Sequence, residues 1–559
     1  MNIKMIKNSG YSWIEEHGVN FKGYFLWNGE LYREQKAVQA FQKLASYSDF
    51  VSFVSQLNGC FAVVVEKGNT AFAAVDRACS IPLFFSRDGK FISDSSEHIR
   101  EKMGIAKENV SLPHLAEFIA KTYLVLNDTV YEQIAQLNLG QSLYVDDTRV
   151  SASYYYRHIQ NIVNTTREAA KLKATEIITR IFENIKKIVG ERPVILSLSG
   201  GYDSRLIACM LKEAGFENVL CYSYGNSKSY ETVLSKQIAQ SLNYQWHFTE
   251  YSKEKILALL SDEQTEAYRQ MYGEHIYTIY LQNFSAVQEL SQKGMIPKNA
   301  VFLTGLCGDM PSGVYVPSPE QLERVSFSRE YLAKAFYESK LTFYQPIPEV
   351  ADHFIRELEQ DIPDTPIKTS QDYVSVLDCL EVSAPHIRCF IKMNNAHEFF
   401  GGEWLMPLWD NEWLDFWYSL PMDMRYKQNL YEDWLMESIF AKYDLVARKK
   451  DVAAIKTIVN YKPWDIRKKQ TKTKLKYFLW AILNRAAFAI GIPIRHPFDV
   501  NNFSLLNVNY YQQIKNKRLI NWMRLTPVIL DCIRICEQRY GKETLKKVRA
   551  YITGVNRLL

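Results

Sequence analysis

The order of hydrophobic and polar positions divides the chain into two parts with different periodicities. Up to about residue 150, short apolar runs come in pairs, and a turn sequence joins each pair. The pairs occupy residues 21–32, 60–76 and 82–93, and their turns are Asn28-Gly29, Lys67-Gly68-Asn69 and Asp88-Gly89. Asn and Gly accept the positive φ that tight hairpin turns require. We therefore predict serial β-hairpins in an antiparallel layer, with a polar, tyrosine-rich connector at residues 151–162.

From residue 166 onward, helical periodicity alternates with short apolar runs. Such runs are expected for strands that are covered on both faces. The predicted strands are residues 193–198, 218–224, 246–251 and 300–305, and the predicted helices are residues 166–189, 206–215 and 230–242. This alternation favours a parallel, doubly wound sheet, in which ligands bind at the carboxyl ends of the strands. After about residue 320 the pattern is mostly helical and rich in Trp and Tyr.

Composition narrows the class of protein without identifying it. The chain has 559 residues, of which 47% are hydrophobic, so it is long enough for two or three domains with sizeable cores. Lys and Arg number 67 against 62 Asp and Glu, and this balance argues against nucleic acid as a main partner. The nine cysteines form no CxxC pair, which argues against zinc sites and favours a reducing compartment. We find no signal peptide and no apolar run of membrane-spanning length, and therefore predict a cytoplasmic protein.

The segment Ser199-Gly200-Gly201-Tyr202-Asp203-Ser204 carries the strongest chemical signal. It follows a predicted buried strand and opens a predicted helix. Its glycines let the backbone approach an anion closely, and their N–H groups form an anion nest with the helix N-terminus. Asp203 suits a site that also holds Mg²⁺, which is bound by one or two carboxylates together with phosphate oxygens. The alternative is a glycine-rich turn without a ligand.

This loop is not a Walker A motif, because the GK[ST] ending is absent. It resembles the loop of the ATP pyrophosphatases, which release pyrophosphate while AMP passes to a carboxyl or carbonyl group of the substrate. The resemblance implies that the protein binds ATP and Mg²⁺.

Further segments resemble the asparagine synthetase family, and they occur in a single order along most of the chain. They are residues 28–32 (NGELY), 57–65 (LNGCFAVVV), 76–86 (DRACSIPLFFS), 224–225, 304–309 (TGLCGD), 403–410 (EWLMPLWD) and 448–450 (RKK). The resemblance implies a truncated α+β sandwich of the Ntn-hydrolase type at residues 1–150, a degenerate class II glutamine amidotransferase domain. It also implies an α/β ATP pyrophosphatase domain of the adenine nucleotide α hydrolase type at residues 165–450. A helical, basic extension follows at residues 451–559.

The same resemblance assigns roles to individual residues. Asp203 and Asp309 are expected to bind the Mg²⁺–pyrophosphate unit from two strand ends, although Asp309 could also be a solvated turn residue. Lys427, with Arg425 nearby, is the candidate for a catalytic lysine that the family places near the pyrophosphate; a solvated helix end is the alternative. The expected nucleotide-binding residues are Ser197, Ser199, Gly200, Gly201, Asp203, Ser204, Tyr224, Thr304 and Gly305.

The chain departs from the family pattern in both halves. The family's glutaminase works through an N-terminal cysteine, whereas the first cysteine here is Cys60, inside a predicted strand. Asn28 would be the relic of an oxyanion donor, but a hairpin turn accounts for it. In the second half, Leu306, Met310 and Leu405 replace two acids and an arginine that surround the acyl acceptor and the nucleophile. We therefore expect no glutaminase activity, and a substrate other than free aspartate.

A basic, amphipathic stretch lies at residues 467–494. Its lysines and arginines precede an apolar run that Asn484 and Arg485 interrupt, so it is a poor membrane span but a fair interfacial helix. A core-packed helix with a charged entry is the favoured interpretation. Contact with a membrane surface, which would suit a substrate on a lipid carrier, is the alternative.

These features predict an ATP-dependent carbon–nitrogen ligase that adenylates a carboxylate for attack by ammonia or an amine. The substrate could be a small molecule, a glycan or a peptide. Alternatives are glutamine-hydrolysing asparagine synthase proper, amidation of sugar acids in surface-polysaccharide assembly, and cyclisation of peptides or β-lactams. A non-catalytic nucleotide-binding scaffold is an alternative from a different class, and a tRNA-modifying member of the same ATP superfamily is a further alternative. The sequence also leaves open a homodimer.

Overall fold

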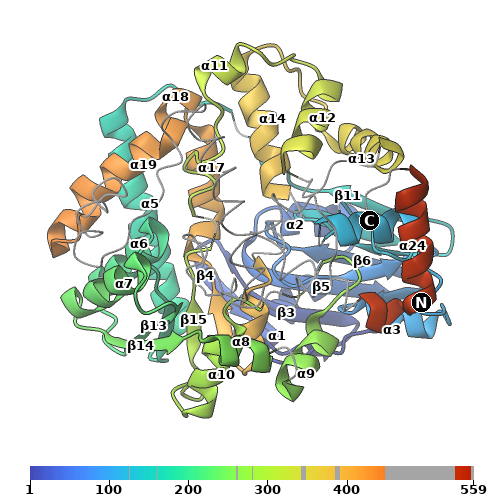
Figure 1. Cartoon of the computed structure of the whole chain (residues 1–559), viewed down its shortest axis with the longest axis horizontal. Coiled ribbons are helices and arrows are strands. Elements are labelled where there is room, and N and C mark those ends of the chain that lie inside the picture. The colour runs from blue at the N-terminus through green and yellow to red at the C-terminus, as the bar shows by residue number, and fades with distance from the viewer. Residues whose placement is uncertain are drawn as a thin grey trace, which may run out of the picture.

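The computed structural model describes residues 1–446 and 536–555, except residues 122, 125, 160, 260, 261, 278, 280, 307, 341–347 and 384–390. Figure 1 shows the N-terminal strands, in blue, beside a separate parallel sheet whose strands are green. The helices α11 to α14 lie at the top of the view.

The N-terminal part contains a seven-stranded sheet in which all neighbouring strands are antiparallel. The strand order is β11-β10-β6-β5-β3-β2, and β4 pairs with β3. The strands are β2 (Ile14–Glu16), β3 (Val19–Trp27), β4 (Glu30–Arg33), β5 (Asn58–Lys67), β6 (Thr70–Val75), β10 (Gln141–Val145) and β11 (Val150–Tyr154). The hairpins predicted at residues 21–32 and 60–76 are confirmed, and Asn28 and Gly29 both have positive φ.

The prediction of a connector at residues 151–162 is wrong in its first part. Residues 150–154 form β11, which pairs with β10 at the edge of the sheet. None of its residues is fully buried, which is why its polar sequence looks like a linker.

A second sheet packs against the first and turns the N-terminal part into a sandwich. Its order is β1-β8-β7-β9, with strands β1 (Asn2–Lys4), β7 (Phe84–Ser86), β8 (Phe91–Ser93) and β9 (Ile134–Gln136). The hairpin predicted at residues 82–93 is confirmed, but it belongs to this sheet, and β1 joins β8 in parallel.

Alternating side chains along β5 and β6 separate the layers of this sandwich. Val64 and Ala73 face the second sheet and share a core with Phe84. Val63 and Val65 face the opposite way. There they meet helices α1 (Glu34–Gln42) and α2 (Tyr47–Val54), while α3 (Ser96–Lys102) covers the second sheet. The predicted α+β sandwich is therefore confirmed.

The third sheet of the protein is parallel and has five strands, in the order β14-β13-β12-β15-β16. Its strands are β12 (Val194–Ser197), β13 (Val219–Gly225), β14 (Gln245–Glu250), β15 (Val301–Leu303) and β16 (Glu403–Leu405). The first four were predicted. The fifth was not, because three residues within a Trp-rich helical region give too short a pattern.

Helices cover both faces of this sheet, as in a doubly wound fold. Helices α5 (Arg167–Val189), α6 (Tyr202–Glu213) and α7 (Tyr230–Ser241) share a core with one face. The other face packs on α10 (Phe284–Gln292) and on the N-terminal sandwich. The chain turns to one side after β12 and to the other side at β15, so the two strands flank the topological switch point. Ligands bind at such points, beyond the carboxyl ends of the strands.

One of the remaining described helices lies in the N-terminal part of the chain, and the others connect strands of the parallel sheet or follow it in the sequence. They are α4 (Leu112–Lys121), α8 (Lys253–Leu259), α9 (Glu263–Tyr272), α11 (Pro319–Leu322), α12 (Arg329–Lys340), α13 (Pro348–Asp361), α14 (Ser370–Ser383), α16 (Asn394–Phe399), η1 (Pro407–Trp409), α17 (Asn411–Ser419), α18 (Met422–Arg425), η2 (Tyr426–Gln428), α19 (Asn429–Trp434), η3 (Leu435–Ile439), η4 (Phe440–Tyr443) and α24 (Lys542–Val555). The predicted helical character beyond residue 320 is confirmed for this part.

The predicted extension at residues 451–559 is described only around α24, which is helical. The basic stretch at 467–494 lies outside the described residues. Among the helices that the structure describes, none combines the length and apolarity needed to span a bilayer.

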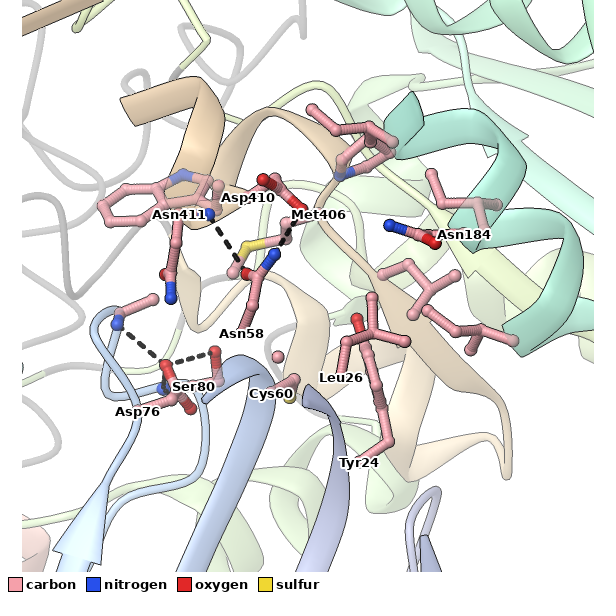
Figure 2. A pocket seen from close by; sticks show the side chains of 18 of the residues that line it. Tyr24, Leu26, Asn58, Cys60, Asp76, Ser80, Asn184, Met406, Asp410 and Asn411 are labelled. Atoms are coloured by element: carbon pink, nitrogen blue, oxygen red, sulfur yellow. Dashed lines mark hydrogen bonds between the residues drawn. The ribbon is translucent and has the colours of Figure 1, made fainter. Parts of the chain in front are cut away.

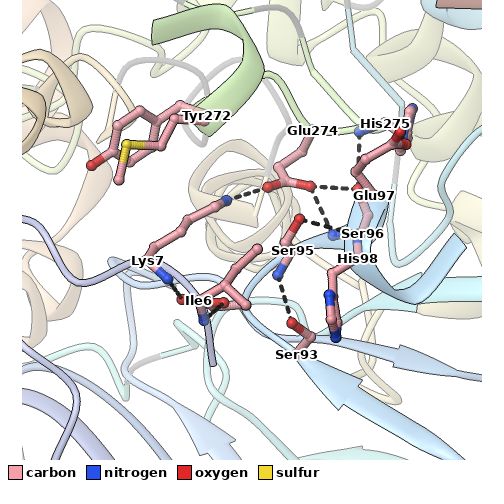
Figure 3. A network of polar contacts seen from close by, with 12 residues as sticks. Ile6, Lys7, Ser93, Ser95, Ser96, Glu97, His98, Tyr272, Glu274 and His275 are labelled. Carbon is pink, nitrogen blue, oxygen red and sulfur yellow. Dashed lines mark hydrogen bonds and ion pairs between the residues drawn. The ribbon is translucent and has the colours of Figure 1, made fainter. Parts of the chain in front are cut away.

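A polar network ties residues 536–540, which precede α24, and the N-terminal segment to the sandwich (Figure 3). Lys7 forms an ion pair with Glu274, whose other oxygen accepts a hydrogen bond from Ser96 N at 2.9 Å. On the other side, Nε2 of His275 lies 2.7 Å from Glu97 Oε2, and Nδ1 of His275 lies 2.8 Å from the hydroxyl oxygen of Tyr540. Segments from four distant parts of the sequence therefore meet here.

Candidate active site

The glycine-rich loop lies between β12 and α6, as the sequence predicts. Its shape is held by hydrogen bonds between its own serines: Ser199 N donates to Ser204 Oγ at 3.1 Å, and the two hydroxyls lie 3.0 Å apart. Gly201 N donates to Ser199 Oγ at 3.1 Å. The serines therefore set the conformation of the loop from within, and α6 begins with the acidic residue Asp203 in its first turn.

Arg205 supports the loop from behind. Its guanidinium donates to the carbonyls of Gly200 and Leu445 at 3.0 and 2.9 Å, and the side chain is buried. Burial lowers the pKa of Arg205, but from an ordinary value above 12, so the side chain stays charged. A positive charge therefore lies directly behind the turn in which the sequence predicts phosphate binding.

The loop after β15 lies against the loop after β12 at very short distance. A Cβ atom added to Gly305 would lie 2.7 Å from Ser204 N, and one added to Gly308 would lie 2.9 Å from Asp203 Cγ. Real Cβ atoms are not found so close to other heavy atoms, so both positions need glycine. This close approach brings the segment that carries Asp309 next to Asp203.

The predicted nucleotide-binding residues line one pocket of about 490 Å³. This volume is within the range of ligand-binding pockets. The lining includes every nucleotide-binding residue that the sequence predicts, together with the second carboxylate: Ser197, Ser199, Gly200, Gly201, Asp203, Ser204, Tyr224, Thr304, Gly305 and Asp309. The structure thus brings ten predicted residues from three strand ends to the switch point. Their roles in binding stay predictions.

Tyr431 is a residue of this site that the sequence did not indicate. Its hydroxyl donates to Asp203 Oδ1 at 2.8 Å, and its side chain is fully buried. Burial first, and then the carboxylates of Asp203 and Asp309, raise the pKa of Tyr431 well above its ordinary value. The phenol therefore stays protonated beside both acids. No motif surrounds it, since it arrives from α19, far along the chain.

Lys427, expected near the pyrophosphate, does not line the nucleotide pocket. It is exposed, has positive φ, and its Nζ lies 4.9 Å from the centre of the Tyr426 ring. It is not among the residues that line the pocket, whereas its neighbour Gln428 is. Arg425 is fully buried and donates to Asp378 at 2.6 and 3.1 Å, so it serves the helical core.

Further polar residues at the pocket come from α16 and from the position before α10, and neither segment carries a recognisable motif. His397, on α16, is fully buried, and its Nε2 lies 2.9 Å from the Tyr222 hydroxyl. Its ring stacks on Phe302 with centroids 4.3 Å apart. Burial lowers the pKa of His397 to about 3, so the imidazole is neutral. Asn283 also lines the pocket and donates to the Met393 carbonyl at 3.0 Å.

The three apolar replacements of family residues lie around this site. Leu306 lines the pocket, and its carbonyl accepts a hydrogen bond from Trp409 Nε1 at 3.1 Å. Met310 and Leu405 are buried in the core. No charged side chain stands at these three positions.

A small cavity of about 50 Å³ lies between the sandwich and β16 (Figure 2). Cys60 lines it and is buried, and burial raises the pKa of its thiol well above the ordinary value. Two buried carboxylates, Asp76 and Asp410, also line the cavity, and burial raises the pKa of each to about 6. Asn58 donates to Asp410 Oδ2 at 2.7 Å. Asn28 lies outside this cavity, exposed in its hairpin turn.

Two family models match the chain. The model described as asparagine synthase matches residues 185–450, and the model described as a glutamine amidotransferase domain matches residues 42–156. A search of curated proteins finds no match. Among solved structures, an NH₃-dependent NAD synthetase from Campylobacter jejuni subsp. jejuni NCTC 11168, in complex with the nitrate ion, is 17% identical over 35% of this chain and 95% of that chain. The TM-score is 0.20, which is too low to support a conclusion.

Proposed function

Because the chain belongs to the asparagine synthetase family, we propose that it is a ligase that joins a carboxylate to ammonia or an amine and converts ATP into AMP and pyrophosphate. Its asparagine synthase domain makes it an ATP-dependent ligase. The observation that carries the finer proposal is the convergence of the serine–glycine loop, Asp203 and Asp309 on one pocket at the switch point.

The residues present fit a bound Mg²⁺–triphosphate. Asp203 and Asp309 supply two carboxylates, and the serine–glycine loop leads into the N-terminus of α6, where the first N–H groups of a helix favour an anion. When bound, Mg²⁺ neutralises charge on the phosphate oxygens. Tyr224, Thr304 and Ser197 line the rest of the pocket and are the proposed contacts of the nucleoside.

The proposed reaction has two steps. A carboxylate oxygen of the substrate attacks the α-phosphorus of ATP, the bond from that phosphorus to the bridging oxygen breaks, and pyrophosphate leaves. The nitrogen of ammonia or an amine then attacks the acyl carbon, the bond to AMP breaks, and the nitrogen loses a proton. The protein contributes mainly by positioning and by charge neutralisation. The neutral ring of His397 is suited to orient groups in the pocket rather than to carry charge.

We propose that the sandwich does not hydrolyse glutamine, so that nitrogen comes from free ammonia or from an amine substrate. In support, Cys60 and Cys79 are buried in the sandwich, and burial keeps the Cys60 thiol protonated. Asn28, the relic of an oxyanion donor, is exposed in a hairpin turn.

The acid substrate is proposed to differ from aspartate, because Leu306, Met310 and Leu405 replace charged residues of the family pattern. Amidation of a sugar acid and cyclisation of a peptide or β-lactam remain the named alternatives for the chemistry, and glutamine-dependent asparagine synthesis is the reaction that these replacements disfavour.

A product assay tests the proposal. The protein is incubated with ATP, Mg²⁺, ammonium and a panel of carboxylic acids, and AMP and pyrophosphate are quantified together. We expect equal amounts of both in the presence of a suitable acid, and a loss of about a hundredfold or more in Asp203→Asn and Asp309→Asn. Asp364→Asn, a variant at an exposed position, serves as the control. Formation of ADP and phosphate, or no product with any acid, contradicts the proposal and favours a scaffold.

A further inference from the structure

An apolar groove of about 510 Å³ lies outside the nucleotide pocket, with which it shares no lining residue. Its walls come from the segment after β15, from α11 and from α18. Val316, Pro317, Leu322, Phe327, Met422 and Tyr426 form its apolar lining. The volume is that of a ligand site rather than of a packing defect.

Two chain segments connect this groove with the nucleotide pocket. Tyr426 lines the groove and Gln428 lines the pocket, and two residues span at most about 7.6 Å. The segment from Asp309 to Val316 also has one end in each. Gln428 donates to Ser312 Oγ at 2.8 Å, so the two segments lie against one another. The groove therefore adjoins the end of the pocket where Asp309 lies.

Exposed apolar side chains surround the same region. Phe327, Tyr331 and Val314 are 38%, 37% and 40% exposed, and each is large. Single exposed apolar residues are ordinary, whereas a group beside an apolar groove marks a surface that binds something. The nearby replacements Leu306 and Met310 remove charge from the same side of the pocket. These positions favour an apolar ligand, and they offer no charged partner for the side chain of aspartate.

The charged residues of the groove affect how a charged ligand is oriented in it. Glu323 and Asp423 line it, and their negative charge repels a carboxylate. Lys427 is exposed, and its Nζ lies 4.9 Å from the centre of the ring of Tyr426, which lines the groove. A ligand with one carboxylate and an apolar body is therefore expected to place its body in the groove and its carboxylate away from Glu323 and Asp423.

We propose that the groove binds the apolar body of the acid substrate, and that this substrate is a monocarboxylic acid with an aliphatic or aromatic body larger than the aspartate side chain. This assignment rests on the proposed ligase function. Phe327, Met422 and Tyr426 determine specificity.

A binding measurement tests the groove independently of turnover. Pyrenebutyrate, a fluorescent acid with an aromatic body, is titrated against the full chain with Mg²⁺ and a non-hydrolysable ATP analogue present. We expect Phe327→Glu and Met422→Glu to weaken this binding at least about tenfold, because each places a charge in an apolar wall. Leu172→Glu, at an exposed position on α5, should bind pyrenebutyrate as the wild type does. All variants should bind the ATP analogue normally, which shows that they are folded.

A turnover measurement then separates this inference from the proposed function. Octanoate and phenylbutyrate are compared with aspartate and succinate as acids that drive release of AMP and pyrophosphate. Preference for the apolar acids, with a higher KM and little change in kcat in the groove variants, supports the inference.

Equal pyrenebutyrate binding in wild type and groove variants, or no binding at all, overturns the inference. If polar acids alone are turned over, the groove assignment fails and the ligase function stands. If pyrenebutyrate binds in the groove and no acid is turned over, the groove is a binding site for apolar acids, and the ligase function fails together with the assignment of that acid as its substrate.

Discussion

The hydroxyl of Tyr431 donates a hydrogen bond to Oδ1 of Asp203 at 2.8 Å, so a buried phenol holds one oxygen of the carboxylate that is proposed to bind the metal. The phenol comes from α19 and the carboxylate from the first turn of α6. This contact fixes the orientation of Asp203 through a residue more than two hundred positions away in the sequence.

Replacing Tyr431 by Phe removes this hydrogen bond while the ring still fills its space. We expect the Mg²⁺ concentration for half-maximal activity to rise several-fold, and the free energy of unfolding to fall by only about 1 kcal/mol. Titration of pyrophosphate release with Mg²⁺ measures the first effect. Tyr47→Phe, which removes a phenol that contacts Ser142 in the sandwich, is the matched control. An unchanged Mg²⁺ requirement in Tyr431→Phe would show that Asp203 does not depend on the phenol.

The contact between the two site loops predicts a steric effect at Gly305. In Gly305→Ala, the new Cβ would meet backbone atoms of Asp203 and Ser204 at 2.9 and 2.7 Å. Because backbone cannot move aside cheaply, we expect ATP to bind at least about tenfold more weakly. Gly104→Ala meets no atom within 4 Å but has positive φ; it should cost about 1–2 kcal/mol of stability and leave ATP binding unchanged. Calorimetric titration with ATP distinguishes the two. Normal ATP affinity in Gly305→Ala would contradict the close packing of the loops.

The buried imidazole of His397 makes stability depend on pH. Its pKa in the folded protein is lowered to about 3 by burial, below the value of about 6.5 in an unfolded chain. The unfolded state therefore binds a proton that the folded state does not, and stability falls as pH falls through this window. Between pH 7 and pH 5, the stability difference between wild type and His397→Gln should shrink by about 2 kcal/mol.

Urea unfolding at several pH values measures this difference, with His17→Gln, at an exposed turn, as the control for loss of an imidazole. A pH-independent difference between wild type and His397→Gln would mean that the folded state binds this proton as readily as the unfolded chain does.

The Lys7–Glu274 pair predicts a large effect on stability. Burial raises the pKa of Glu274, but Lys7 and the hydrogen bonds from Ser96 outweigh it and lower the pKa below the ordinary value. The ionised carboxylate therefore stabilises the fold above the ordinary pKa of Glu, and this contribution is lost as pH falls below it. Glu274→Gln leaves the buried Lys7 ammonium without its partner charge and should cost about 3–5 kcal/mol.

Hydrogen exchange of β1 and thermal unfolding measure this effect. Glu30→Gln breaks an exposed pair with Lys36 and should change stability by about 1 kcal/mol or less. Comparable losses in the two variants would argue against a stabilising role of the buried network.

Local patterns were sufficient for most strands and for the nucleotide loop. Asn28-Gly29 predicts its hairpin because the turn geometry needs positive φ, and the run from Val194 to Leu196 predicts a buried strand because both faces are covered. Asp203 and Asp309 could be paired because both follow strands of one parallel sheet, whose carboxyl ends share an edge.

The remainder of the site depends on long-range packing, which no local pattern encodes. Tyr431 and His397 come from helices whose relation to the sheet is set by the whole helical region, so neither carries a signal in its neighbours. Lys427, a basic residue at the expected place in the sequence, is exposed, and its neighbour Gln428 lines the pocket; its catalytic role stays a prediction. Strand β16 was missed because three residues give no period.

The central claim is that two carboxylates and the serine–glycine loop jointly hold a metal–nucleotide complex. Electron paramagnetic resonance of Mn²⁺, titrated into the protein with and without ATP, tests it most directly. The account predicts a tightly bound Mn²⁺ that appears only with ATP and is lost in both Asp203→Asn and Asp309→Asn, while Asp364→Asn retains it. Undiminished ATP-dependent Mn²⁺ binding in both site variants would contradict it.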